Sequence, residues 1–200
     1  MNNKTIIDLS SVNYDNLPFP HFYSASVLQN KVEKLLYDWF ENAEIWNLTK
    51  EDFYEQYELD FLNNELPENL KCLIDDTTIY KIAESIKTNF NINELDLVGI
   101  VAHKLIDGQR IGIHNDFIDY EETHRLVIHI NPHWQEKNGG ILMLFNSSEV
   151  KDVAKMINPI NNSGFSFEIS VNSHHAVSRI YDYSRYTLIY TFKKRSNEFV

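Results

Sequence analysis

Two residues near the middle of the chain have types and a spacing that suit metal binding. His114 and Asp116 stand on either side of Asn115, in the segment GIHNDF. In a β-strand, residues two apart point to the same face, so one imidazole and one carboxylate would project together. A third ligand is available from the adjacent pair His174 and His175. Neighbouring strand residues face opposite sides, so only one of that pair can join the site.

The chemistry of this combination favours iron. Of the eight histidines, seven follow residue 100: His103, His114, His124, His129, His133, His174 and His175. Two imidazoles and one carboxylate on one side of a metal form the facial triad of Fe(II) oxygen chemistry, which leaves the opposite side open. A structural zinc site would normally use several thiolates, and the chain has one cysteine.

A second pair of residues predicts an organic acid beside the metal. Arg185 and Thr187 share one face of the strand-like run RYTLIYTF. A guanidinium matches a carboxylate with two parallel hydrogen bonds, and a hydroxyl can donate to the same group. We predict that this pair holds the far carboxylate of a dicarboxylic acid whose α-keto acid end chelates the metal.

The elements that must position these residues differ between the two parts of the chain. Residues 1–92 are predicted to be mainly helical, with helices over 26–43, 49–62 and 77–90 that have apolar residues three or four apart. In the first helix, Ser26 and Gln29 fit a capping box. In the second, Phe53, Tyr57 and Phe61 would form one apolar face.

From residue 93 to 195 the pattern is typical of short β-strands. LDLVGIVAHKL, HRLVIHIN, GGILMLF, GFSFEIS, HAVSRI and RYTLIYTF are separated by turn signals such as DG, NP, NGG and NNSG. Strands without intervening helices predict an antiparallel sandwich or barrel, with the helices on one outer face. No linker divides the parts, so we predict one α+β domain over 1–200.

The composition excludes several classes of protein. A net charge of −11 and a pI of about 5.1 argue against a bulk nucleic-acid binder, which needs cations to neutralise phosphate. No apolar stretch approaches the roughly 18 residues of a membrane span, and the N-terminus lacks the apolar core of a signal peptide. We therefore expect a cytoplasmic protein with no membrane partner. The sequence does not indicate an oligomeric state.

An ordered series of motifs resembles one known family. The segments are DGQRIGIHND, RLVIHINPHW, NGGILMLF, INPINNSGFSFEIS and HHAVSRIYDYSRYTLIYTF, which together cover roughly residues 95–193. Their order and spacing resemble the 2-oxoglutarate and Fe(II)-dependent oxygenases, in the prolyl 4-hydroxylase-like branch. The resemblance implies a double-stranded β-helix, or jelly-roll, core.

The resemblance also implies a set of site residues. His114, Asp116 and His175 would bind Fe(II), with His175 preferred to His174 because it directly precedes a small residue and Val. Arg185 and Thr187 would hold 2-oxoglutarate. His129 stands where the family places a polar cosubstrate contact, often Tyr, and no Tyr occurs over residues 103–105. Both are departures from the family pattern.

The implied activity is hydroxylation of an unactivated C–H bond, with 2-oxoglutarate and O2 consumed and ascorbate as a possible reductant. The expected substrate is an amino-acid residue in a peptide or protein. A free amino acid or small-molecule natural product is the alternative, and desaturation or cyclisation would use the same site. Two alternative functions belong to other classes of protein. One is a cupin-type metal-dependent hydrolase or isomerase, and the other is a non-catalytic metal-binding or sensor domain.

Overall fold

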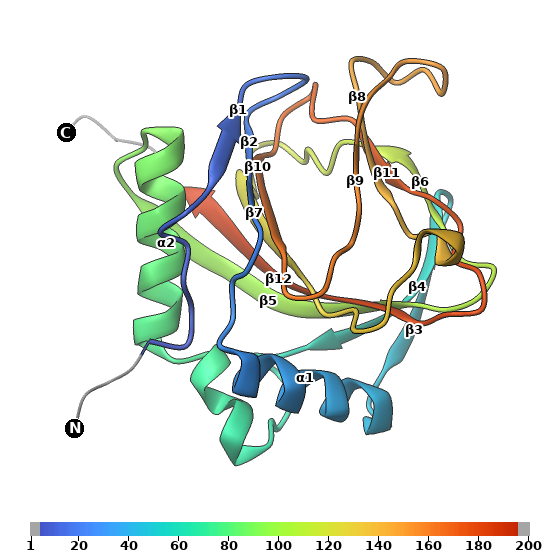
Figure 1. Ribbon diagram of the computed structural model, residues 1–200. Coiled ribbons are helices and arrows are strands. Elements are labelled where there is room, and N and C mark those ends of the chain that lie inside the picture. Colours follow the sequence, from blue (N-terminus) through green and yellow to red (C-terminus); the bar gives the residue numbers. More distant parts are fainter. Residues whose placement is uncertain (1–4, 196–200) are drawn as a thin grey trace.

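The computed structural model describes residues 5–195 (Figure 1). Its helices are α1 (Asn30–Asn42), α2 (Asp76–Phe90) and two short 3₁₀ helices, Glu68–Leu73 and Glu136–Asn138. Its strands are β1 (Asn13–Asp15), β2 (His21–Ser24), β3 (Asn47–Glu51), β4 (Tyr54–Asp60), β5 (Leu95–Leu105), β6 (Ile111–His114), β7 (His124–His129), β8 (Leu142–Phe145), β9 (Val153–Ile157), β10 (Gly164–Glu168), β11 (His175–Val177) and β12 (Arg185–Lys194).

The described strands form one antiparallel sheet that curls into a half-barrel (Figure 1). The strand order is β1-β2-β10-β7-β12-β5-β4-β6-β11-β8-β9, and β3 pairs with β4 at its side. β4 pairs with β5 over Tyr57–Asp60 and with β6 at Tyr54. It therefore joins the strands on one side of the half-barrel to those on the other.

The central strands alternate between the inside and the outside of the curl. On β12, Arg185, Thr187 and Ile189 line the inner cavity, whereas Leu188 and Tyr190 belong to the outer hydrophobic cluster. The strand period of two explains this division. Polar inward positions on a strand with an apolar outer face are what a binding cavity requires.

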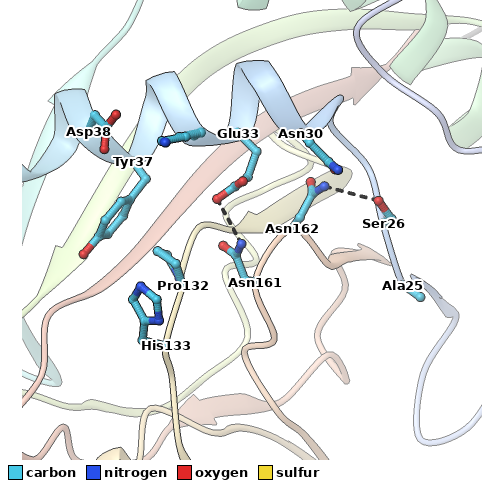
Figure 2. Close-up of a pocket in the computed structure, with 11 residues that line it drawn as sticks. Ala25, Ser26, Asn30, Glu33, Tyr37, Asp38, Pro132, His133, Asn161 and Asn162 are labelled. Atoms are coloured by element: carbon cyan, nitrogen blue, oxygen red, sulfur yellow. Dashed lines mark hydrogen bonds between the residues drawn. The ribbon is translucent and has the colours of Figure 1, made fainter.

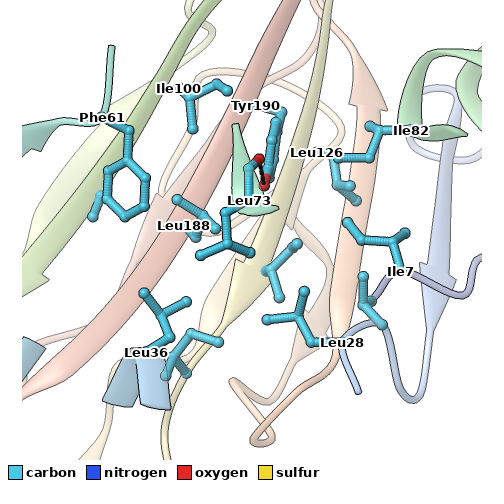
Figure 3. Packing of buried hydrophobic residues seen from close by; sticks show 14 of the residues in the cluster. Ile7, Leu28, Leu36, Phe61, Leu73, Ile82, Ile100, Leu126, Leu188 and Tyr190 are labelled. Atoms are coloured by element: carbon cyan, nitrogen blue, oxygen red, sulfur yellow. Dashed lines mark hydrogen bonds between the residues drawn. The ribbon is translucent and has the colours of Figure 1, made fainter. Parts of the chain in front are cut away.

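The outer face of the sheet carries the main hydrophobic core (Figure 3). Leu36 of α1 and Ile82 of α2 are fully buried in the same cluster as Leu188 and Tyr190 of β12. The Tyr190 hydroxyl donates to the Leu73 carbonyl at 2.8 Å, which satisfies its one polar group inside the core. The predicted helix over 77–90 and the predicted strands from residue 95 onward are confirmed.

The prediction of a helix over 49–62 is wrong. This segment forms the β3–β4 hairpin, with Leu48 opposite Tyr57 and Glu51 opposite Tyr54. The spacing of Phe53, Tyr57 and Phe61 fits one face of a helix, but four is also a multiple of the strand period of two. With β1 to β4 in this part, residues 1–92 are not mainly helical.

The capping box at the start of the first helix is also wrong. α1 begins at Asn30, and its N-cap residue Gln29 makes no capping hydrogen bond with its side chain. The Gln29 side-chain amide donates instead to the Thr5 carbonyl, and the Ser26 hydroxyl accepts from Asn162 at 3.2 Å. The side chains of Ser26 and Gln29 therefore hold the segment before α1 by contacts with other parts of the chain, and they do not cap the helix.

Across residues 5–195, none of the helices has both the length and the apolar character that crossing a lipid bilayer demands.

Candidate active site

Two predicted ligands face each other across a pair of strands. His114 on β6 and His175 on β11 are direct partners in the strand register, and their rings lie 4.2 Å apart between centroids. Each ring is fixed by a backbone carbonyl: Nδ1 of His114 lies 3.0 Å from the Gly112 oxygen, and Nδ1 of His175 lies 2.7 Å from the Ser173 oxygen. With Nδ1 donating, Nε2 of each ring keeps a lone pair for a metal.

Asp116 completes the cluster from beyond the end of β6. Its backbone has φ of 60°, a left-handed conformation that is uncommon for a residue with a side chain. Its carboxylate oxygens lie 3.3 Å from Nε2 of His114 and 3.2 Å from Nε2 of His175. The three ligand atoms all lie within 4.8 Å of one another. The left-handed turn, rather than strand alternation, brings the carboxylate to the histidines.

The carboxylate of Asp116 is held in its charged form. Burial alone would raise its pKa, but the positive charge of the Arg125 guanidinium holds the pKa well below its usual range. Nη1 of Arg125 donates to Asp116 at 2.7 Å, and its other terminal nitrogen pairs with Glu122. Asp116 therefore enters the site as an anion.

The donor set fits a divalent metal. Burial, and then the nearby His114, lower the pKa of His175, which favours the neutral imidazole that metals bind. Phe53, near the tip of the β3–β4 hairpin, stacks on His114 with ring centroids 4.9 Å apart. Two imidazoles held through Nδ1 and one anionic carboxylate on one side of a point match the Fe(II) facial triad.

The cluster opens into a cavity of about 850 Å³ inside the curled sheet. Arg185 and Thr187 line the same cavity and are nearly fully buried. Nε of Arg185 donates to the Gly140 carbonyl at 3.0 Å, and burial lowers the pKa of this guanidinium to about 10. No carboxylate among the described residues pairs with Arg185, so its terminal nitrogens suit an acidic ligand.

Gly140 makes room for this arginine. Its φ of 70° is left-handed, and a Cβ at this position would lie 2.8 Å from Cδ of Arg185. A glycine meets both conditions without strain because it has no side chain. Gly140 therefore does more than form a turn, because it leaves space for the Arg185 side chain.

His129 lies deeper, beside Thr187 in the register of β7 and β12. It is fully buried, and neither ring nitrogen has a hydrogen-bond partner within residues 5–195. Burial, followed by the charge of Arg185, lowers its pKa well below the usual range. A neutral, buried imidazole with unpaired nitrogens suits a ligand contact, although His129 does not itself line the cavity.

Two other histidines line the cavity outside the cluster. His174 faces the cavity, but the three-residue cluster contains His175 instead. His103 on β5 also lines the cavity, and burial, then the charge of Arg125, lower its pKa to about 3. The structure thus brings His114, Asp116 and His175 together, and it places Arg185 and Thr187 in the same cavity.

Sequence reasoning missed the contacts that four residues make in the site. Phe53 was assigned to a helix, and its contact with His114 depends on the hairpin. The ion pair of Arg125 with Asp116 links residues on different elements, so no spacing in the sequence indicates it. Gln56 and Glu58 line the cavity from β4, and their alternation was the available signal.

A second hollow, of about 650 Å³, lies between α1 and the loops near residues 132 and 161 (Figure 2). Asn161 donates to Glu33 at 2.9 Å across it, and its side-chain oxygen accepts from the backbone of Asn131. Asn162 holds the segment before α1 through Leu28. These contacts tie α1 to the sheet, and the hollow contains none of the three clustered ligands.

Comparison with known proteins agrees with this geometry. The family model of the 2OG-Fe(II) oxygenase superfamily matches residues 101–192, which include all three clustered residues and Arg185. No curated protein sequence matches the chain.

Solved structures with a similar fold include several prolyl hydroxylases. A Pseudomonas putida prolyl-4-hydroxylase has a TM-score of 0.68 at 17% identity, over 88% of this chain and 93% of that one. A Trichoplax adhaerens prolyl hydroxylase bound to a hypoxia inducible factor peptide fragment has a TM-score of 0.70 at 14% identity, over 87% and 83%.

A viral collagen prolyl hydroxylase from Paramecium Bursaria Chlorella virus-1, in complex with 2OG, has a TM-score of 0.65 at 12% identity, over 88% and 96%. At these identities the likeness concerns the fold, a curled sheet similar to the jelly rolls of such enzymes. The family match covers the residues of the cluster itself. Over residues 101–192, and with all three clustered ligands included, the chain therefore resembles the enzymes of the 2OG-Fe(II) oxygenase superfamily, whose members use Fe(II), 2-oxoglutarate and O2.

Proposed function

We propose that this oxygenase hydroxylates an unactivated C–H bond of an amino-acid residue in a peptide or protein. His114, Asp116 and His175 bind the metal, and Arg185 with Thr187 binds the far carboxylate of 2-oxoglutarate. The observation that carries the proposal is the presence, in one buried cavity, of the three ligands and a guanidinium without a carboxylate partner among the described residues.

The chain's own residues hold the metal in a fixed geometry. When bound, Fe(II) with 2-oxoglutarate supplies the oxidising chemistry that cleaves the C–H bond. The Gly112 and Ser173 carbonyls fix the two rings, so that Nε2 of each points to the shared site. Arg125 keeps the Asp116 carboxylate anionic and limits its rotation. Buried surroundings restrict access of water to these groups.

Three residues form the proposed cosubstrate site. Arg185 offers its terminal nitrogens to the carboxylate, and Thr187 can donate its hydroxyl to the same group. His129, beside Thr187, offers a neutral ring nitrogen where many relatives use Tyr. A carboxylate bound here would compensate the buried positive charge of Arg185. This compensation favours binding of an acid at this place.

The proposed substrate class follows from the cavity and from the structural neighbours. The cavity has a volume of about 850 Å³, which is more than one metal ion and a small dicarboxylic acid would occupy. The similar structures are prolyl hydroxylases, and the T. adhaerens enzyme was solved with a peptide. We infer that a peptide segment reaches the metal through the open side of this cavity.

We also infer that residues 1–200 act as one oxygenase domain with a double-stranded β-helix core and helices on its outer face. β4 pairs directly with β5 and β6, and α1 and α2 share a hydrophobic cluster with β12. Separation of the two parts would expose this cluster to water, which is unfavourable.

The test is incubation with Fe(II), ascorbate, 2-oxoglutarate and pools of peptides or free amino acids. We expect succinate, together with a product heavier by one oxygen atom in the peptide pool. Arg185→Ala should abolish succinate formation, whereas Arg110→Ala, at an exposed position, should not. Metal binding without succinate in any pool would favour a sensor domain, and turnover that survives Arg185→Ala would favour a hydrolase or isomerase.

A further inference from the structure

One carboxylate in the cavity has no role in holding the metal or the cosubstrate. Glu58 lies on β4, lines the cavity and stands opposite His103 in the strand register. One of its oxygens accepts a hydrogen bond from Nε2 of Gln56 at 2.8 Å. Within residues 5–195, Glu58 forms no ion pair with Lys, Arg or His.

The neighbours of Glu58 leave its charge uncompensated. His103 is neutral, because burial, then the charge of Arg125, lower its pKa to about 3. Lys104 follows His103 in the sequence. Its ammonium lies over the rings of Trp46 and Tyr186, at 5.9 and 5.5 Å from their centroids. Those rings belong to the cluster on the outer face of the sheet. Neither His103 nor Lys104 therefore compensates the charge of Glu58.

Gln56 adds a second acceptor at the same place. Its side chain is 3% exposed and lines the cavity, and Oε1 has no hydrogen-bond partner in the described part of the chain. The bond from Nε2 to Glu58 fixes the amide orientation, because a flip would bring two oxygens together. A buried acceptor without a partner is unfavourable, and a donor from a ligand would satisfy it.

The other acidic groups of the cavity are already occupied. Asp116 and Glu122 pair with Arg125. Both oxygens of Asp60 accept hydrogen bonds within its own turn, two of them from backbone amides. Among the described residues, Glu58 is the cavity carboxylate that has neither a cationic partner nor hydrogen bonds from backbone amides.

From these observations we propose that the substrate carries a cationic amine or guanidine, which pairs with Glu58 and donates to Oε1 of Gln56. This inference rests on the proposed function, since it concerns the substrate of the same cavity. A net charge of −11 over the chain would also draw a cation toward the protein. The target is then a peptide or amino acid with a basic group near the carbon that is oxidised.

The experiment compares N-acetyl-lysine amide and N-acetyl-arginine amide with N-acetyl-norleucine amide, which has an uncharged chain of similar length. Binding is followed by ligand-observed NMR on protein loaded with Zn(II) and 2-oxoglutarate. Loading is measured first and tests the proposed function separately. If the protein does not load, the same titrations are made without metal, and the same dependence on Glu58 is expected.

The wild type should bind at least one cationic probe about tenfold more tightly than the norleucine probe. Glu58→Gln should remove this preference. Glu55→Gln is the matched control, because it makes the same charge change on the same strand at a residue that pairs with Lys50 outside the cavity. Equal binding of charged and uncharged probes, no binding of any probe, or a preference that survives Glu58→Gln would each overturn the proposal.

Discussion

Replacing Arg185 by Met should stabilise the ligand-free protein. The guanidinium is 4% exposed, and burial lowers its pKa to about 10. That shift corresponds to roughly 3 kcal/mol of unfavourable free energy for the charged form. Methionine has a similar length and no charge, so the substitution removes this cost while most of the packing remains.

The expected gain is smaller than this cost because one hydrogen bond is lost. The bond from Nε to the Gly140 carbonyl contributes about 1–2 kcal/mol. The net increase in the free energy of unfolding is then about 1–2 kcal/mol, or a rise in Tm of roughly 2–8 °C for a chain of this size.

Thermal unfolding with Zn(II), in the absence and presence of 2-oxoglutarate, measures both effects. At 2-oxoglutarate concentrations near 100 times Kd, the wild type should gain about 2.7 kcal/mol, and Arg185→Met should gain nothing. Arg110→Met, at an exposed position, controls for the loss of one positive charge. A loss of stability of several kcal/mol in the ligand-free Arg185→Met protein, with the response to 2-oxoglutarate retained, would refute the reasoning.

Three further substitutions test other parts of the site. Gly140→Ala should weaken 2-oxoglutarate binding, measured by calorimetry, because the added Cβ would lie 2.8 Å from Cδ of Arg185. An unchanged affinity would contradict the role of this glycine. Phe53→Ala should lower metal affinity by about 2–10-fold through lost stacking on His114, and tighter metal binding would contradict it. Because burial depresses the pKa of His129, the unfolded chain binds a proton below pH 6.5 that the folded chain does not. Stability should therefore fall as pH drops below 6.5, and His129→Gln should reduce that slope by up to about 1.4 kcal/mol per pH unit in urea unfolding. An unchanged slope would show that this imidazole is not buried in its neutral form.

The β-rich part of the fold was predictable because its strands are long, apolar and bounded by turn residues. β5 and β12 occupy the segments expected from their periodicity. The β3–β4 hairpin was not predictable by the same means, because Phe53, Tyr57 and Phe61 repeat every four residues. That spacing satisfies both periods, and tertiary pairing with β5 decides between them.

The same ambiguity explains which site residues were found. His114, Asp116 and Arg185 could be named because spacing and residue type together indicate a metal and an acid, and the family resemblance selected His175 over His174. Phe53, Gln56 and Glu58 reach the cavity only because the hairpin is a pair of strands, so a helical interpretation hid all three. The contact of Arg125 with Asp116 depends on the left-handed backbone of Asp116, which has no clear sequence signal.

Metal binding by three single variants tests the assignment of the ligands most directly. His175→Ala, Asp116→Ala and His174→Ala are equilibrated with Mn(II), and bound metal is measured by elemental analysis and electron paramagnetic resonance. His174 is the matched control, since it adjoins His175 and lines the cavity but lies outside the ligand cluster. We predict one bound ion in the wild type and in His174→Ala, and a loss of affinity of about 100-fold or more in the other two. Retention of the ion by His175→Ala, with its loss in His174→Ala, would contradict the ligand assignment on which the oxygenase site depends.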